Sequence, residues 1–218
     1  GVKQSIVSAN TNAGFSIVKY TGNGISTSKV PHGLGGTPEM IIHKRIDGTS
    51  GWVVNHHNLS SGYEIYLQLA NAQTNSMGND GGMPNGTQDA TTLGFQVGAS
   101  TTNNVNTNGA EYIAYCFRSI SGYSKFGTYT GTGNSGNDID IGFQPDFVMM
   151  KRTDSTGNWQ IFGYDNVKEL YPNLSDAEYT SGSNTINSDG FTPQGNGSWN
   201  NSGGTFIYMA FKMNPTPM

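Results

Sequence analysis

The sequence has few charged residues, and this scarcity excludes one class of function. Asp, Glu, Lys and Arg make up 12% of the 218 residues, about half of the ~25% found in an average globular protein. The net charge at pH 7 is −4, and the only tight basic pairs are Lys44-Arg45 and Lys151-Arg152. Nucleic-acid binding needs a basic face that replaces the counterions of the phosphates. We therefore expect no nucleic-acid partner, and we interpret the two pairs as solvated strand ends.

Long hydrophobic runs and a second cysteine are also missing. No apolar stretch approaches the ~20 residues that a membrane-spanning helix needs, so we expect no membrane insertion. The first residues, Gly-Val-Lys-Gln-Ser, lack the pattern of a signal peptide. The single Cys116 excludes an intrachain disulfide, so packing alone must hold the fold.

Catalytic and metal-binding constellations are absent as well. His56 and His57 are adjacent, and neighbouring residues of a strand point to opposite faces, so they cannot chelate one metal together. Asp47 and Asp154 lie in turn sequences, where an Asp bonds to its own backbone. The acids at 138 and 140 lack the glycine-spaced loop of a calcium site. We therefore expect no enzyme activity, no metal and no cofactor.

The chain does contain a long internal repeat. The pattern Tyr-Thr-Gly-x-Gly occurs at 20–24 and again at 129–133. A Pro-to-Trp segment at 38–52 returns at 145–159, displaced by 107 residues at both ends. A repeat of this length is one folding unit used twice. We predict a lead-in segment at 1–13, a first copy at 14–121 and a second copy at 122–213.

Strand signals fill both copies: short β-branched and aromatic runs bounded by Gly, Asn, Asp and Pro. We expect strands at 16–20, 28–31, 39–44, 52–55, 63–67, 94–97 and 111–118, and then at 124–129, 138–141, 147–151, 159–162, 169–174, 190–192 and 205–212. Seven short strands in ~100 residues are typical of a β-sandwich. The predicted fold class is all-β, with two tandem, internally duplicated, jelly-roll-like β-sandwich units. The best helical candidates are 66–72 and 167–177.

The repeat separates residues that the fold needs from residues that are free to serve a site. Trp52 and Trp159 occupy equivalent positions, so we expect both to anchor a core in matching interior slots. Cys116 corresponds to Ala210, which indicates a small buried hydrophobic residue rather than a nucleophile.

Trp199 is the strongest divergent feature. It lies in a polar glycine loop, and the corresponding loop at 101–109 has no aromatic residue. A large indole in such a loop commonly marks a contact, and the amides beside it could bind sugar hydroxyls. The alternative is that Trp199 folds back over a sheet edge. Tyr164-Asp165, which replaces His56-His57, is a second divergent position. The candidate ligand-binding residues are therefore Trp199, Asn200, Asn196, Tyr164, Asp165, His56 and His57.

Four motifs together resemble a tandem domain of uncharacterised bacteriophage proteins, abundant in marine phages and frequent in tail-fibre-like chains. They are Tyr-Thr-Gly-x-Gly, His-Gly-Leu-Gly-x-x-Pro, Phe-Val-Met-x-Lys-Arg-x-Asp-Ser-Thr-x-x-Trp and Tyr-Ile-Ala-Tyr-Cys-Phe. The resemblance covers the chain from about Gly14 to Phe211 and supplies no catalytic residues. It implies a place on the virion surface, other virion proteins as partners, and a homotrimer by analogy with phage fibres.

The leading functional hypothesis is an adhesion module, not an enzyme, that binds the surface polysaccharide of a bacterial host. Long polar loops on a rigid sandwich suit weak contacts that a particle makes multivalent. A second hypothesis is a purely structural tail or capsid-decoration protein, which contacts other virion proteins and no glycan. A third is a polysaccharide-degrading enzyme, which needs two acids facing each other across a cleft.

Overall fold

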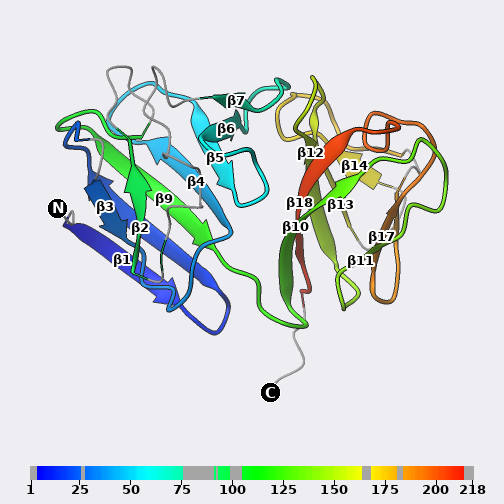
Figure 1. The fold of residues 1–218 in the computed structure, drawn as a ribbon, viewed down its shortest axis with the longest axis horizontal. Helices are drawn as coiled ribbons and strands as arrows, with labels where there is room; N and C mark the ends of the chain where they lie inside the picture. The colour runs from blue at the N-terminus through cyan, green and yellow to red at the C-terminus, as the bar shows by residue number, and fades with distance from the viewer. Residues whose placement is uncertain are drawn as a thin grey trace. The chain divides into compact units, whose positions relative to one another are not determined.

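The computed structural model describes residues 4–25, 28–75, 91, 93–98, 105–163, 168–180 and 184–213. These residues contain strands, bridges and turns and no helix, so the fold is all-β, as predicted. The chain forms two compact units, which we call unit 1 and unit 2 (Figure 1). Unit 1 comprises Gly1–Leu67 and Gln73–Arg118, and unit 2 comprises Gln68–Ala72 and Ser119–Met218.

Unit 1 is a sandwich of a large and a small antiparallel sheet. The large sheet has the order β1-β2-β9-β4-β5-β6-β7, and the small sheet pairs β3 with β8. The strands are β1 (Ser5–Asn10), β2 (Phe15–Thr21), β3 (Ser28–Pro31), β4 (Met40–Arg45), β5 (Trp52–His56), β6 (Tyr63–Tyr66), β7 (Thr74–Asn75), β8 (Gly94–Val97) and β9 (Glu111–Phe117).

Unit 2 has the same two-layer design. Its large sheet has the order β10-β18-β12-β13-β14-β15, and its small sheet has the order β11-β17-β16. The strands are β10 (Ser124–Thr130), β11 (Ile139–Asp140), β12 (Phe147–Arg152), β13 (Trp159–Gly163), β14 (Lys168–Leu170), β15 (Tyr179–Thr180), β16 (Asn184–Ile186), β17 (Gly190–Pro193) and β18 (Thr205–Phe211).

The two large sheets agree in strand order and in register. In unit 1 the last strand, β9, lies between β2 and β4, and in unit 2 the last strand, β18, lies between β10 and β12; β4 and β12 both end in Lys-Arg. Lys44 pairs with Trp52 across β4 and β5, and Lys151 pairs with Trp159 across β12 and β13. This agreement is what a duplicated unit predicts. Common descent of the two units stays an inference.

Each core fills the space between the two sheets of its unit. β2 and β9 alternate between buried and more exposed residues along their length, which is the pattern of a strand with one face on a core. The core of unit 1 includes Tyr20, Phe95 and Tyr112, and that of unit 2 includes Tyr129, Phe191 and Phe206. Cys116 and Ala210 are both fully buried in these cores, as expected from their equivalence.

Some expected and observed elements differ. The described parts of the two helical candidates, 66–72 and 167–177, contain no helix, and residues 168–170 form β14. The segment predicted as a lead-in at 1–13 contains β1, which pairs with β2 along six residues. β1 escaped the sequence pattern because it is exposed along nearly its whole length and shows no apolar alternation. The short β7, β15 and β16 were also not predicted.

The expectation that Trp52 and Trp159 occupy matching interior slots is wrong for Trp52. Trp159 is 1% exposed, whereas Trp52 is only half-buried, with its ring 6.4 Å from that of Tyr115 and 6.0 Å from Lys44 Nζ. In unit 2, the segment 68–72 bonds to the neighbours of the tryptophan. The carbonyl oxygen of Ala70 accepts the amide of Gly157 at 2.8 Å. Trp52 and Trp159 therefore have the same register position but differ in how far other residues bury them.

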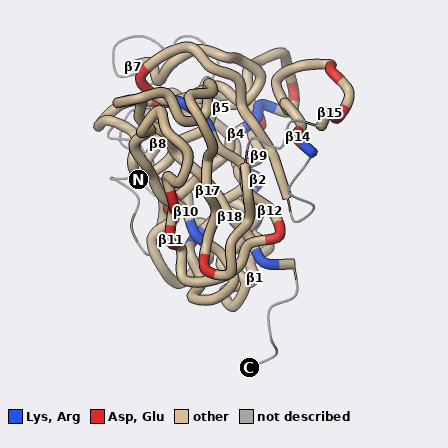
Figure 2. Tube along the Cα trace, turned by 90° about the vertical axis from the view of Figure 1, so that its right-hand side faces the viewer, with Lys and Arg blue, Asp and Glu red and all other residues tan. Residues whose placement is uncertain are grey.

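Charged residues are sparse along the trace of the chain (Figure 2). Between residues 4 and 213, the described part contains no helix that is long and apolar enough to cross a membrane.

Candidate ligand pocket of the second unit

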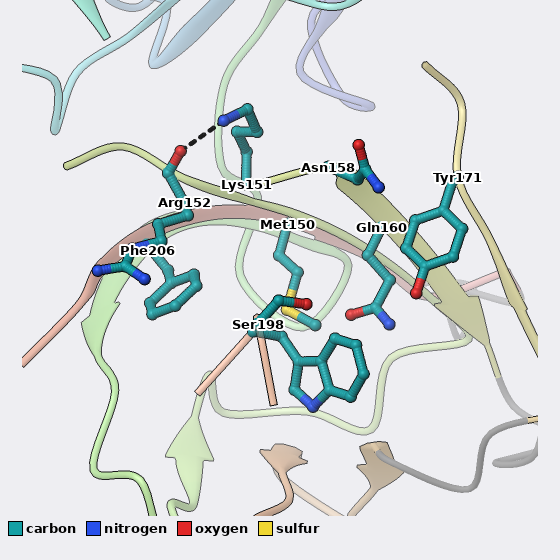
Figure 3. A pocket seen from close by; sticks show the side chains of 9 residues that line it. Met150, Lys151, Arg152, Asn158, Gln160, Tyr171, Ser198 and Phe206 are labelled. Carbon is teal, nitrogen blue, oxygen red and sulfur yellow. Dashed lines mark hydrogen bonds between the residues drawn. The ribbon is translucent and has the colours of Figure 1, made fainter. Parts of the chain in front are cut away.

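Unit 2 contains a small pocket of about 10 Å³, room for about one water molecule, formed by one end of its large sheet and the loop before β18 (Figure 3). β12, β13 and β18 contribute one wall, the residue after β14 contributes Tyr171, and the loop contributes Ser198 and Trp199. In Figure 3, Met150, Gln160 and the hydroxyl of Tyr171 point to the same side of the strands, while Lys151 points to the other. The lining residues are Met150, Lys151, Arg152, Asn158, Gln160, Tyr171, Ser198, Trp199 and Phe206.

Asn200 holds the loop that carries Trp199. Its side chain is fully buried, and its Oδ1 accepts the amide of Thr132 at 3.0 Å and the Nδ2 of Asn137 at 2.8 Å. Its Nδ2 donates to the carbonyl oxygens of Asn134 and Gly195, both at 2.8 Å. Proposed from the sequence as a ligand contact, Asn200 is instead a structural residue, because both ends of its amide are used inside the fold.

Unit 1 contains the same arrangement around Asn106. This side chain is fully buried, accepts the amide of Asn23 at 3.0 Å, and donates to the carbonyl oxygens of Ile25 and Gly98. In both units a tyrosine hydroxyl donates to the carbonyl oxygen of the residue before this asparagine. Tyr20 donates to that of Val105 at 2.8 Å, and Tyr129 donates to that of Trp199 at 2.7 Å. The positions of Val105 and Trp199 are therefore structurally equivalent.

The first glycine of the Tyr-Thr-Gly-x-Gly motif is explained by the same loops. A Cβ atom at Gly22 would overlap the carbonyl oxygen of Thr107, and one at Gly131 would overlap that of Asn201. Only glycine lets the two backbones approach this closely. The repeated motif therefore serves the fold. Asn106 and Asn200 each stand three residues before a glycine and five before the last strand, a signal that the sequence comparison missed.

The sequence left open whether Trp199 contacts a ligand or folds back over a sheet edge, and the structure shows features of both. Its ring is half-buried and packs against the core of unit 2, and its Nε1 lies 3.4 Å from the carbonyl oxygen of Gln194. A Cβ atom at Gly197 would overlap the indole, so this glycine allows the loop to lie against the ring. The indole also lines the pocket. Val105, at the equivalent position, is fully buried in the core of unit 1.

The other predicted site residues do not gather at this pocket. Asn196 is exposed in the Trp199 loop and is not among the lining residues. His56 is buried in β5 of unit 1, with its Nδ1 3.2 Å from the amide of Asn58, and its ring lies 4.9 Å from that of His57. Tyr164 and Asp165 lie outside the described residues.

A buried carboxylate behind the pocket was missed by sequence reasoning. Glu169 is 2% exposed, and its Oε2 accepts the amide of Gln160 at 2.5 Å and the hydroxyl of Tyr179 at 2.8 Å. Its Oε1 accepts the amide of Asn184 at 2.8 Å. The hydroxyl oxygens of Tyr171 and Tyr179 are 2.6 Å apart, and burial followed by these bonds raises the pKa of Tyr179. Gln160 and Tyr171 thus connect the pocket to Glu169.

The carboxylate has a counterpart in unit 1. Glu64 is buried, and Tyr66 donates to its Oε1 at 2.6 Å. Ile65 pairs with Val54, and Leu170 pairs with Ile161 at the equivalent place, so Glu64 and Glu169 occupy the same position in the two sheets. The sequence signal is Glu-Ile-Tyr at 64–66 and Glu-Leu-Tyr at 169–171. The sequence comparison missed this pair because its two members are 105 residues apart, whereas the main repeat has a spacing of 107.

The basic residues beside the pocket are already engaged. Arg152 donates from Nε and Nη2 to the two oxygens of Asp154, at 2.9 and 3.1 Å, and from Nη1 to Asn201 at 3.0 Å. This pairing lowers the pKa of Asp154. Lys151 is buried rather than solvated, which corrects the expectation for this pair: its Nζ donates to the carbonyl oxygens of Asn71 at 2.8 Å and Arg152 at 2.6 Å.

In the described part of the chain, no three His, Cys, Asp or Glu side chains are grouped so that they could hold a metal ion. Asp140, considered for calcium, accepts the amide of Gly142 at 2.8 Å. Asp154 accepts the amide of Thr205 at 3.0 Å, a bond that reaches β18 rather than the backbone of its own turn.

Comparison with known proteins gives a family but no activity. A family model described as "Domain of unknown function (DUF7483)" matches residues 1–215. No curated protein matches the chain, and neither does any solved structure.

Proposed function

Because the chain belongs to the DUF7483 family, whose description assigns no activity, we propose a function from the geometry of unit 2: it is a non-enzymatic adhesion module that binds glycans of a bacterial surface. The binding residues are Trp199, Tyr171 and the amides beside them. Asn196, exposed in the same loop, is placed to extend the contact outside the pocket.

The observation that carries this proposal is the replacement of core residues by pocket residues in unit 2. Trp199 stands where unit 1 has the buried Val105, and Gln160 stands where it has the buried Val53. An indole beside amides and a phenol supports recognition of a sugar, since the ring packs on the apolar face of a pyranose while polar groups bind its hydroxyls.

Binding without hydrolysis is favoured by the acids around the pocket. No Asp or Glu is among its lining residues. Glu169 lies behind Gln160, and cleavage of a glycosidic bond generally uses two carboxyl groups about 5–9.5 Å apart on either side of the bond. A single buried acid that is fully engaged by amide and phenol donors supports a positioning role instead.

The setting of the module is a virion surface, which is proposed from the resemblance of the repeated motifs to phage tail-fibre-like chains. Weak sugar binding at one pocket becomes useful when many copies act together, as in a fibre or on a capsid. Other virion proteins are then partners, and a homotrimer is one arrangement that supplies several copies. The alternative, a purely structural virion protein, predicts no glycan binding.

The test measures binding of the intact chain to glycan arrays and to bacterial cells, with Trp199→Val as the key variant. Valine is the residue at the equivalent position of unit 1, so the substitution removes the indole and keeps a side chain that this loop geometry accepts. We expect binding to fall about tenfold or more, because stacking on an aromatic ring contributes on the order of 1–2 kcal/mol.

The matched control is Trp52→Val, which removes a half-buried indole from unit 1. It should leave binding within about twofold of the unmodified chain, provided that thermal unfolding shows both variants folded. Equal binding by Trp199→Val and the unmodified chain would contradict the site, and absence of binding to any glycan or cell would contradict the function.

A further inference from the structure

The large sheet of unit 1 ends in a strand that the large sheet of unit 2 lacks. β1 lies at the border of its sheet and pairs with β2 on one side (Figure 1), whereas the sheet of unit 2 begins at β10, the equivalent of β2. Alternate residues of a border strand direct their N–H and C=O groups away from the sheet. Within the described part of the chain, these outward main-chain groups of Ser5–Asn10 have no hydrogen-bond partner.

The other border strands of the two large sheets are protected against further pairing, and β1 is not. β7 and β15 have two residues each, and β10 carries the exposed Lys125. Short strands and edge lysines both discourage pairing with another chain. β1 has six residues, none of them charged and none a proline, and its Ile6 is 75% exposed. Its edge is therefore suited to receive another strand.

β1 is already held in position by its own unit. It pairs with β2 along six residues, and Val7 lies opposite the buried Val18, on the face that looks toward the small sheet. On that face, Ser5 Oγ donates to the carbonyl oxygen of Pro31 at 3.3 Å, and a Cβ atom at Gly33 would lie 2.9 Å from Val7 Cγ1. An edge that is already ordered loses little conformational entropy when it binds a partner.

The outer face of β1 complements itself. Ile17, which is 36% exposed, lies opposite Ser8 across β1 and β2. When two β1 strands pair antiparallel about a two-fold axis through the sheet, residues that face each other lie on the same side of it. Pairing centred on Val7 therefore places Ile6 opposite Ser8 of the second copy and beside that copy's Ile17. The two isoleucines pack over the small serine at two symmetric places, and no like charges oppose each other.

We propose that β1 is an interaction surface for a second copy of this chain. The two β1 strands pair antiparallel with Val7 opposite Val7, and they join two large sheets of unit 1 into one continuous sheet. A two-fold contact of this kind closes on itself, so it yields a dimer. The contact lies in unit 1 and does not depend on the proposed glycan binding. It doubles the number of modules that an assembly presents.

Sedimentation velocity of the intact chain tests the dimer. A strand-edge contact is smaller than the ~1,600 Å² of a standard interface, so we expect a dissociation constant of about 1–100 µM. With rising concentration, the 23.3 kDa monomer should convert to a dimer. Ser8→Lys places a charge at the edge and should weaken dimerisation about tenfold or more. Because Ser8 is exposed, the thermal midpoint of the monomer should stay unchanged.

The matched control is Thr130→Lys, which adds the same charge at an exposed residue of the border strand β10 and should leave dimerisation unchanged. Val7→Cys tests the register, since a cysteine that faces itself across the two-fold axis is placed to form a disulfide on mild oxidation. Ala9→Cys is its control, because residue 9 faces Ser5 of the second copy. The natural Cys116 is buried and should form no cross-link.

A dimer that Ser8→Lys weakens and that Val7→Cys cross-links more than Ala9→Cys supports the proposal. A chain that stays monomeric at every concentration overturns it. Self-association that Ser8→Lys leaves unchanged, in a dimer or a trimer, also overturns it. So does cross-linking by Val7→Cys that does not exceed that of Ala9→Cys, and this result stands even where Ser8→Lys fails to fold.

Discussion

At the scale of single residues, equivalent positions of the two units either keep the same structural role or differ in role. Asn106 and Asn200 are both buried, and each joins the loop before the last strand of its unit to the Tyr-Thr-Gly-x-Gly turn. Val105 and Trp199 directly precede them, yet one is a core residue and the other lines a pocket. A residue next to a fixed anchor is well placed for a site, because the anchor holds its backbone while its side chain changes.

Lys151 yields a residue-scale prediction about pH. Burial lowers its pKa to about 8 from an ordinary value of 10.5. Between these values the folded state binds fewer protons than the unfolded chain, so the free energy of unfolding rises with pH in that window. Because one pKa unit corresponds to about 1.4 kcal/mol, we expect the unmodified chain to gain about 1–3 kcal/mol over Lys151→Met between pH 7.5 and 10.

The measurement is urea unfolding of both proteins at several pH values, and the difference between them cancels groups that they share. Lys44→Met removes the equivalent lysine of unit 1, which is half-buried. A difference between the unmodified chain and Lys151→Met that stays constant would show an unshifted pKa for Lys151, and one that falls with rising pH would show a raised pKa; either result contradicts the prediction.

At the scale of structural elements, the Tyr-Thr-Gly-x-Gly turn, which follows β2 in unit 1 and β10 in unit 2, determines where the last loop of its unit lies. Its tyrosine bonds to the carbonyl group of Val105 or Trp199, and its first glycine packs against the residues that follow. Its second glycine, Gly24 or Gly133, has φ of 68° or 72°, a conformation that favours glycine. The pocket therefore depends on a turn at the other end of its unit's sequence.

Gly131→Ala tests this element. The added Cβ atom would overlap the carbonyl oxygen of Asn201, so the Trp199 loop must shift. We expect a loss of about 2–4 kcal/mol in the free energy of unfolding and weaker glycan binding. Gly157→Ala is the control, because its Cβ atom would lie at an ordinary 3.4 Å from that of Arg152. Urea unfolding compares them, and equal stability of the two variants would refute the role of the turn.

At the scale of the whole molecule, low charge makes the fold depend on packing and neutral hydrogen bonds. The four ion pairs of the described residues join side chains that are 20–47% exposed. Such pairs contribute about 0–1 kcal/mol each. Stability of the chain should therefore depend little on the salt around it.

The corresponding prediction concerns ionic strength. Because there is little charge to screen, the midpoint of thermal unfolding should change by less than about 2 °C between 20 and 300 mM NaCl. Differential scanning calorimetry measures this. Lys19→Gln, which removes the exposed pair with Glu111, should behave in the same way. A shift above about 5 °C in the unmodified chain would show that electrostatic interactions matter more than the ion pairs indicate.

Much of the fold could be predicted from the sequence, since strand positions depend on local signals. The segments at 28–31 and 94–97 became β3 and β8 with the predicted bounds, and the expected all-β class was confirmed. β1 was missed because both of its faces are largely exposed, which leaves no alternation to detect. Trp199 was found as a divergent aromatic residue, whereas Glu169 was overlooked because its repeat is short and out of phase.

The sequence by itself determined most of the strands, many of the turns and the agreement between the two copies, because these follow from neighbours along the chain. Only the tertiary structure decided what those residues do. In the folded chain Asn200, which the sequence suggested as a ligand contact, is buried. Trp159 is also buried, whereas Trp52 is only half-buried. The tertiary structure also joined Glu169 to Gln160 and Asn184. Burial and hydrogen bonding depend on residues far apart in the chain, so local pattern does not encode them.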